Sequence, residues 1–168
     1  MLPEPDNFIV LPSMRFSGRD AFAQLVRDAM TAAAQQGWRT IVVCDANFED
    51  WPLQEKAVSD SLHAWSKSGR RFVMLASRYD HVTRNYARFV AWRKSWDHII
   101  ECRTCRNVGS ADFPSAVWSP TWALKRLDLV HSTGVCGSES SRRVHIRETL
   151  DELMLGSAPG FPASVLGL

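Results

Sequence analysis

Polar and charged side chains follow two short apolar runs of the chain, at residues 40–44 and 72–76. In chain order they are Asp45, Asn47, Glu49, Asp50, Ser77, Arg78, Asp80 and His81. In open α/β sheets, ligands bind at the carboxyl ends of the strands, where such loops meet. Neighbouring carboxylates could hold a divalent cation, and a guanidinium could hold a phosphate. A solvated loop that leads into a helix needs the same composition, and this second interpretation is favoured because no glycine-rich phosphate loop accompanies the residues.

Three basic side chains fall on one face of a helix that is predicted over residues 79–96. His81, Arg84 and Arg88 have the spacing i, i+3 and i+7. Such a stripe could bind phosphates through two-pronged hydrogen bonds, although a solvated helix face has the same pattern. The ligand-binding residues predicted from the sequence are therefore Arg78, Arg84, Arg88 and Asp45.

Two cysteines have the spacing of half a zinc site. Cys102 and Cys105 form a C-x-x-C pair, and His131 with Cys136 could complete four ligands. A single pair is weak evidence, and Cys102 also suits a small buried position on a predicted strand. We predict four free thiols, no metal site and no cofactor, because the cysteines are too sparse for a disulfide scaffold.

No recognisable frame for nucleophilic catalysis is present. The sequence contains neither a G-x-S-x-G elbow nor a P-loop, and its five histidines are scattered along the chain. Each histidine is interpreted as a surface or core residue rather than as a general base. We therefore predict no catalytic residue.

The elements that position these residues alternate between strand and helix. Apolar residues with helical spacing predict a helix over 17–36, with Ser17 as its N-cap and Gly37 at its end. Continuous apolar runs predict strands that are covered on both faces, and weaker signals predict further elements. The predicted strands are 8–11, 40–44, 72–76, 98–102, 116–118 and 127–130, and the remaining predicted helices are 53–68, 79–96 and 140–155.

This order predicts a single α/β domain over residues 1–168. We expect a three-layer α-β-α sandwich with a central, mostly parallel or mixed sheet, in which the strands at 40–44, 72–76 and 98–102 are adjacent. The late strands are expected to run antiparallel at an edge. Residues 1–14 are expected to form an N-terminal tail or an edge strand, and the apolar residues 158–168 to pack on the domain.

The overall composition is that of a globular protein. Of 168 residues, 45% are hydrophobic and 23% are charged, and the net charge of +2 is spread over interspersed acids and bases. This balance argues against a nucleic-acid partner. The N-terminus does not resemble a secretory signal, and no apolar stretch approaches the roughly 20 residues that span a bilayer. We expect a soluble, cytoplasmic protein without a membrane partner.

Four segments together resemble an uncharacterised bacterial family that is distantly similar to one half of the phospholipase D fold. They are DANFEDWPL (45–53), FVMLA (72–76), RFVAWRKSWDH (88–98) and PGFPASVLGL (159–168), and the likeness extends over residues 15–168. That superfamily acts through His-x-Lys-x4-Asp, with the histidine as nucleophile toward phosphorus, and this chain does not contain the motif. The nearest string, His145-Ile-Arg147 with Glu152, lies in a predicted amphipathic helix, and residues 115–122 offer tryptophan and proline where the motif is expected. The resemblance implies the fold and a phosphate-binding ancestry without that catalysis.

Three functions remain open from the sequence. The leading hypothesis is a non-catalytic phospholipase D-like domain that binds an anionic small molecule or a protein partner. The first alternative is a phosphoester- or nucleotide-processing enzyme that uses the 45–50 loop for a metal and Arg78 for a phosphate. The second is a nucleic-acid accessory protein, and a homodimer is left open in each case.

Overall fold

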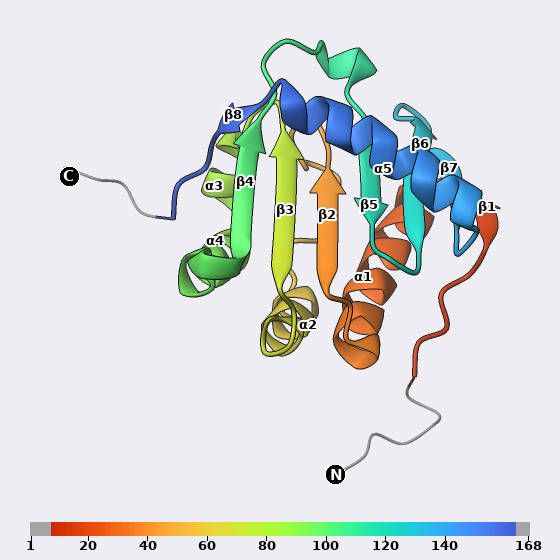
Figure 1. The fold of residues 1–168 in the computed structure, drawn as a ribbon, viewed down its shortest axis with the longest axis horizontal. Helices are drawn as coiled ribbons and strands as arrows, with labels where there is room; N and C mark the ends of the chain where they lie inside the picture. Colours follow the sequence, from red (N-terminus) through yellow and green to blue (C-terminus); the bar gives the residue numbers. More distant parts are fainter. Residues whose placement is uncertain (1–7, 164–168) are drawn as a thin grey trace.

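The computed structural model describes residues 8–163, in which one sheet is covered by helices on both faces (Figure 1). Its helices are α1 (Arg19–Gln36), α2 (Lys56–Ser66), α3 (Asp80–Asn85), α4 (Ala87–Ser95) and α5 (Ser140–Leu155). Its strands are β1 (Met14–Phe16), β2 (Thr40–Cys44), β3 (Arg71–Ala76), β4 (Ile100–Thr104), β5 (Ser115–Trp118), β6 (Ala123–Asp128), β7 (Thr133–Gly137) and β8 (Ala158–Pro159). None of the helices within residues 8–163 is long and apolar enough to cross a membrane.

The sheet is mixed, with the strand order β1-β7-β6-β5-β2-β3-β4-β8. β2, β3 and β4 are parallel neighbours, as the sequence predicts, because each is joined to the next by a helical crossover. The late strands β5, β6 and β7 form an antiparallel meander beside β2, and β1 and β8 close the two edges in antiparallel pairings. The carboxyl ends of the three parallel strands therefore share one edge of the sheet, which is the upper edge in Figure 1.

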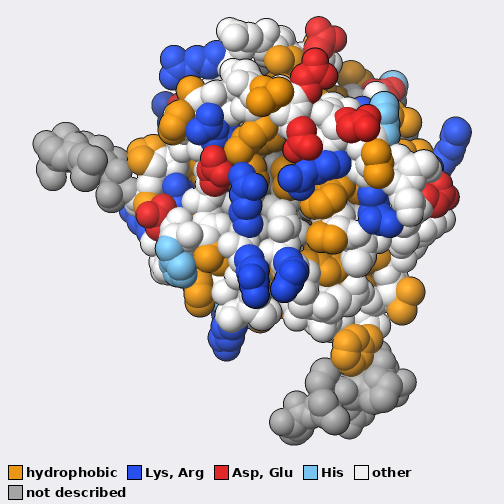
Figure 2. All heavy atoms as spheres, in the orientation of Figure 1, with side chains coloured by type: hydrophobic (Ala, Val, Ile, Leu, Met, Phe, Trp, Pro, Cys, Tyr) orange, Lys and Arg blue, Asp and Glu red, His pale blue; other side chains and the backbone are white. Residues whose placement is uncertain are grey.

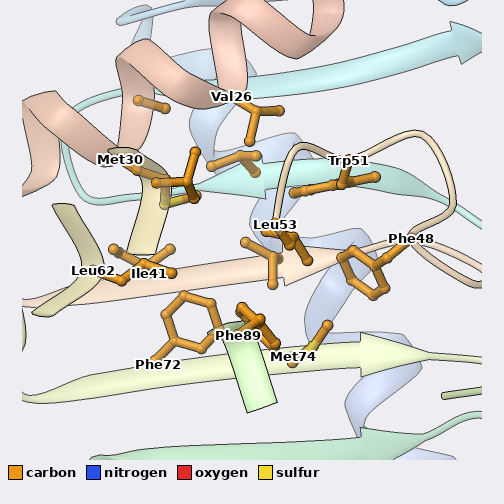
Figure 3. Packing of buried hydrophobic residues seen from close by; sticks show 14 of the residues in the cluster. Val26, Met30, Ile41, Phe48, Trp51, Leu53, Leu62, Phe72, Met74 and Phe89 are labelled. Atoms are coloured by element: carbon orange, nitrogen blue, oxygen red, sulfur yellow. The ribbon is translucent and has the colours of Figure 1, made fainter. Parts of the chain in front are cut away.

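Three layers result from the alternation of side chains along the central strands. Ile41, Phe72 and Met74 point toward α1, α2 and α4, where they join a core rich in aromatic residues (Figure 3). Val42 and Val73 point to the opposite face, which α5 crosses. The predicted α-β-α sandwich is thus confirmed, with α1, α2, α3 and α4 on one face of the sheet and α5 on the other.

The first helix follows its apolar periodicity closely. Phe22, Val26 and Met30 are buried on one face of α1, and Gly37 ends the helix with φ 66°, a left-handed conformation that suits glycine. The predicted N-cap is wrong. Gly18 occupies the N-cap position and no side chain caps the helix, so Ser17 lies one residue outside it.

The helix predicted over residues 79–96 is two helices. α3 ends and α4 begins at Tyr86, whose backbone leaves the helical region with φ −116° and ψ 61°. The Tyr86 hydroxyl donates hydrogen bonds to the carbonyls of Phe48 and Glu49 at 2.6 and 3.0 Å. The break removes the predicted stripe, because Arg84 lies in α3 and Arg88 in α4.

Several predicted boundaries are also wrong. Residues 8–11 are not a strand, and the edge strand is β1; the strand predicted at 98–102 begins at Ile100, after a short 3-10 helix. The strand predicted at 127–130 is β6, which begins at Ala123, and β7 was not predicted. The helix predicted over 53–68 spans only Lys56–Ser66. The apolar C-terminal residues were expected to pack on the domain. Within the described part, β8 pairs with β4 and Phe161 is buried; residues 164–168 lie outside the described part.

Candidate functional site

The loops that follow β2 and β3, together with α3, line an open cavity of about 260 Å³ at the carboxyl edge of the sheet. Both backbone N–H groups of Ser77 and Arg78 donate to the carbonyl of Ala46, at 3.0 and 3.1 Å, and so join the two loops. The cavity is lined by Asn47, Glu49, Arg78, Asp80, His81, Arg84 and Asn85. This is the place where the sequence rule for open α/β sheets puts a ligand.

Two cations of the cavity have no acidic partner in the described part of the chain. Arg78 and Arg84 are exposed, and within residues 8–163 neither side chain takes part in an ion pair or a hydrogen bond. His81 is half-buried, with its Nδ1 atom 3.2 Å from the Asn85 amide nitrogen and its ring edge-on to Tyr86 at 5.1 Å. The guanidinium groups therefore keep their hydrogen-bond donors available to a bound anion.

The loop after β2 is held rigidly in an uncommon conformation. Phe48 has φ 62°, which is unfavourable for a bulky residue. The Asp45 carboxylate accepts the Phe48 N–H at 2.8 Å, Tyr86 holds the Phe48 carbonyl, and the ring packs against Trp51 at 4.7 Å. Backbone strain of this kind concentrates at functional sites and persists only where its surroundings enforce it.

A buried arginine fixes both ends of the same loop. Arg126, on β6, has a side chain that is only 2% exposed and forms ion pairs with Asp45 at 2.9 Å and Asp50 at 3.0 Å. The guanidinium also donates to the hydroxyl groups of Ser115 and Ser132 and lies 4.0 Å from the centre of the Phe22 ring. Because these partners come from distant parts of the chain, the network ties the loop to β5, β6 and α1.

The tyrosine that breaks the helix stays protonated next to this network. Burial raises the pKa of Tyr86 well above its ordinary value, and the nearby carboxylates of Asp50, Asp45 and Glu49 raise it further. The hydroxyl group is therefore a permanent donor to the loop carbonyls. Neither Tyr86 nor Arg126 is among the residues predicted from the sequence to form the site. For Arg126 a signal exists, because it lies two residues after the buried Leu124 and so shares its face of the strand.

The residues predicted to bind ligand divide into two groups. Arg78 and Arg84 line the cavity. Arg88 does not, because its guanidinium donates to the backbone carbonyl of Gln54 at 2.9 Å. Asp45 does not either, because its carboxylate is buried against Arg126. The metal-binding alternative loses Asp45 and Asp50 in the same way, since both pair with one guanidinium, while Asn47 and Glu49 of that loop still line the cavity.

The paired cysteines lie on opposite faces of the sheet. Cys102 packs in the core beneath α4, and Cys105 in the core beneath α5, where its thiol approaches the Leu153 carbonyl. Burial raises the pKa of Cys102 to about 12. His131 is exposed, and its Nδ1 atom lies at hydrogen-bond distance, 2.8 Å, from the Asp128 carboxylate. Across residues 8–163, no three side chains of His, Cys, Asp or Glu come together as metal ligands.

The string that most resembles a phospholipase D motif is part of a helix surface. His145 is exposed on α5, and Arg147 forms an ion pair with Asp151 and lies 4.4 Å from the centre of the Trp118 ring. His145 and Arg147 line two other cavities and are not among the residues that line the carboxyl-edge cavity. They do not form a common site with Arg78 and Arg84.

Comparisons with known proteins identify the fold. No protein-family model and no curated protein sequence matches the chain. Among solved structures, the archaeal chromatin protein TrmBL2 is similar with a TM-score of 0.65 and 12% identity over 94% of this chain, which spans 56% of that protein. Polyphosphate kinase from Porphyromonas gingivalis is similar with a TM-score of 0.50 and 12% identity, over 90% of this chain and 24% of the kinase. The kinase has the fold of the phospholipase D superfamily, so the chain has a phospholipase D-like α/β fold.

Proposed function

We propose that this domain binds a small phosphate-bearing ligand in the carboxyl-edge cavity. The observation that carries the proposal is that Arg78 and Arg84, whose guanidinium groups have no partner within residues 8–163, line the same cavity. A guanidinium presents planar donors that match two phosphate oxygens, and the carboxyl edge of an α/β sheet is a common ligand position.

The other lining residues restrict the kind of ligand. Glu49 and Asp80 offset the two arginine charges, while Asn47 and Asn85 supply amide donors and acceptors. A bare phosphate would leave these groups without partners, whereas a ligand that also carries hydroxyl groups would satisfy them. A phosphorylated sugar or a nucleotide therefore fits the lining better than inorganic phosphate does.

The network below the cavity supports binding rather than mobility. Arg126 and Tyr86 hold the 45–50 loop in its strained form before any ligand arrives. A loop that is already ordered loses little conformational entropy on binding. The similar proteins add support at the level of phosphate chemistry, since one is described as a DNA-binding chromatin protein and the other as a polyphosphate kinase.

A second candidate function is favoured by one observation. His81 lines the cavity together with Arg78 and Arg84, so its imidazole would lie beside a phosphoester bound there. This would allow a phosphoester-processing enzyme with His81 as its acid or base. Turnover of nucleotides or sugar phosphates that is lost in His81→Asn, with ligand binding retained, would favour this candidate over pure binding.

Calorimetric titration with ribose 5-phosphate tests the proposed binding. We expect measurable binding of ribose 5-phosphate and none of ribose, and a loss of at least about tenfold in affinity for R78Q/R84Q, because each charge-assisted hydrogen bond contributes about 1.5–3 kcal/mol. The control is R88Q, which removes one neighbouring exposed arginine outside the cavity and should leave the affinity unchanged. Equal losses in R88Q and R78Q/R84Q would show that the cavity is not the site.

A further inference from the structure

The opposite edge of the sheet carries a group of basic side chains. The chain enters β2 through Arg39, and it enters β3 through Lys67, Arg70 and Arg71. All four are exposed. Because β2 and β3 are parallel neighbours, with Thr40 opposite Arg71, these residues meet at one edge, below the strands in Figure 1. We call the four residues the amino-edge patch.

The amino-edge patch is built on rigid backbone. The carbonyl of Arg39 accepts the N–H groups of both Arg70 and Arg71, at 2.9 and 3.2 Å, which brings the two basic segments together. The Trp65 indole donates to the Trp38 carbonyl at 2.6 Å. Gly69 lies so close to the same indole that a Cβ atom would come within 2.3 Å of it. The backbone that carries the arginines is thus fixed before any partner arrives.

The charges of the amino-edge patch are largely uncompensated. Only Arg71 has an ion pair, with Glu101 at 2.9 Å; within the described residues, Arg39, Lys67 and Arg70 have none. The segments 37–40 and 67–71 contain no acidic residue. In Figure 2, Lys and Arg side chains gather on the lower part of the molecule with no Asp or Glu visible among them.

Helix dipoles account for only part of this arrangement. Lys67 is the C-cap of α2, where a cation is favoured by the partial negative charge of the helix end. Arg39, Arg70 and Arg71 lead into strands and are not in a helix. Arg39 and Arg70 directly precede the parallel neighbours β2 and β3, which are about 4.8 Å apart, and Arg71 is the first residue of β3, so the three arginines are spread along the edge of the sheet.

We infer that the amino-edge patch binds the phosphodiester backbone of nucleic acid without reading its sequence. Among the described residues, the guanidinium groups of Arg39 and Arg70 and the ammonium group of Lys67 have no ion pair, so each can contact a phosphate oxygen, and such contacts need no apolar surface. None of the exposed large hydrophobic residues of the described chain belongs to segments 37–40 or 67–71, although a protein interface would place such residues at its centre. The net charge of +2 does not indicate this surface, because it sums over the whole chain, whereas the fold brings several basic residues together at one edge.

This inference is independent of the proposed ligand cavity, which lies at the other edge of the sheet. The test is fluorescence anisotropy with a labelled DNA duplex of about 20 base pairs, measured over a series of salt concentrations. We expect R39Q/R70Q to bind at least about fivefold more weakly than the wild type at low salt. The slope of log K against log [salt] should fall by about two, because two phosphate contacts are lost.

The matched control is R19Q/R106Q, which removes two exposed arginines that form no ion pair with any described residue and lie outside both surfaces. Its net charge equals that of R39Q/R70Q, so it should retain wild-type binding and slope. Equal weakening of both variants would overturn the inference in favour of general charge attraction, and so would a wild type that binds no duplex. A third outcome is that R39Q/R70Q weakens binding to phosphatidylserine vesicles but leaves duplex binding unchanged. This result would assign the patch to a membrane surface instead. Ribose 5-phosphate binding should be the same in R39Q/R70Q as in the wild type, which separates this test from that of the cavity.

Discussion

The arginines at the carboxyl edge of the sheet have two opposite kinds of surroundings. Arg126 is buried, and its four hydrogen bonds reach two carboxylates and two hydroxyl groups. Arg78 and Arg84 are exposed beside a cavity and have no ion pair among the described residues. A buried charge must be compensated by hydrogen bonds and opposite charges within the protein, whereas an exposed charge is solvated by water until a ligand binds it. The first set therefore serves stability, and the second is free to serve binding.

The largest expected effect of a substitution follows from this contrast. Arg126→Met should lower the free energy of unfolding by about 3–5 kcal/mol, because it leaves the buried Asp45 carboxylate without its partner. Denaturant unfolding followed by tryptophan fluorescence measures the change. In the double variant R126M/D45N the loss should be smaller than the sum of the two single losses. Additive losses would show that the two side chains are not coupled.

The two carboxylates that bind Arg126 should differ in importance. The Asp45 side chain is 7% exposed and also caps its own loop, while that of Asp50 is 30% exposed. We expect Asp45→Asn to cost about 2 kcal/mol and Asp50→Asn about 1 kcal/mol or less, since water compensates the more exposed group. The same unfolding measurement compares them, and a larger loss for Asp50→Asn would contradict the assignment of the buried centre.

An intermediate effect is expected where the two regions meet. Tyr86→Phe removes the hydroxyl that holds the carbonyls of Phe48 and Glu49, and should cost about 1 kcal/mol. It should also weaken ribose 5-phosphate binding, because the strained loop would lose part of its order. If stability falls while the affinity is unchanged, the loop conformation does not contribute to the cavity.

The smallest effect on stability is expected at the cavity itself. R78Q/R84Q should change the free energy of unfolding by no more than about 0.5 kcal/mol, because neither side chain has a partner in the described protein to lose. Thermal unfolding without ligand measures this. A loss comparable to that of Arg126→Met would mean that these arginines are structural, and the contrast between the two sets would disappear.

The sequence alone was sufficient for elements whose pattern is local. The apolar periodicity of α1, the β-branched runs of β2 and β3, and the bounds of α5 agree with the structure because each depends on residues within one element. The position of the cavity also followed from a general rule, since loops after adjacent parallel strands must meet. Arg78, which was selected by that rule, lines the cavity, and so does Arg84, which was selected from the helical spacing; their role in binding stays a prediction.

Only the tertiary structure decided which charges are available. Arg126 and Asp45 are 81 residues apart in the chain, and no local pattern reveals that they form a buried pair. Tyr86 ends α3 because its hydroxyl finds acceptors in a distant loop, and this break separates Arg84 from Arg88. The amino-edge patch arises in the same way, because parallel pairing of β2 and β3 places Arg39 beside Arg70. Local propensity acts within a few residues, whereas the compensation of a charge depends on everything that packs around it, and only the folded chain determines that.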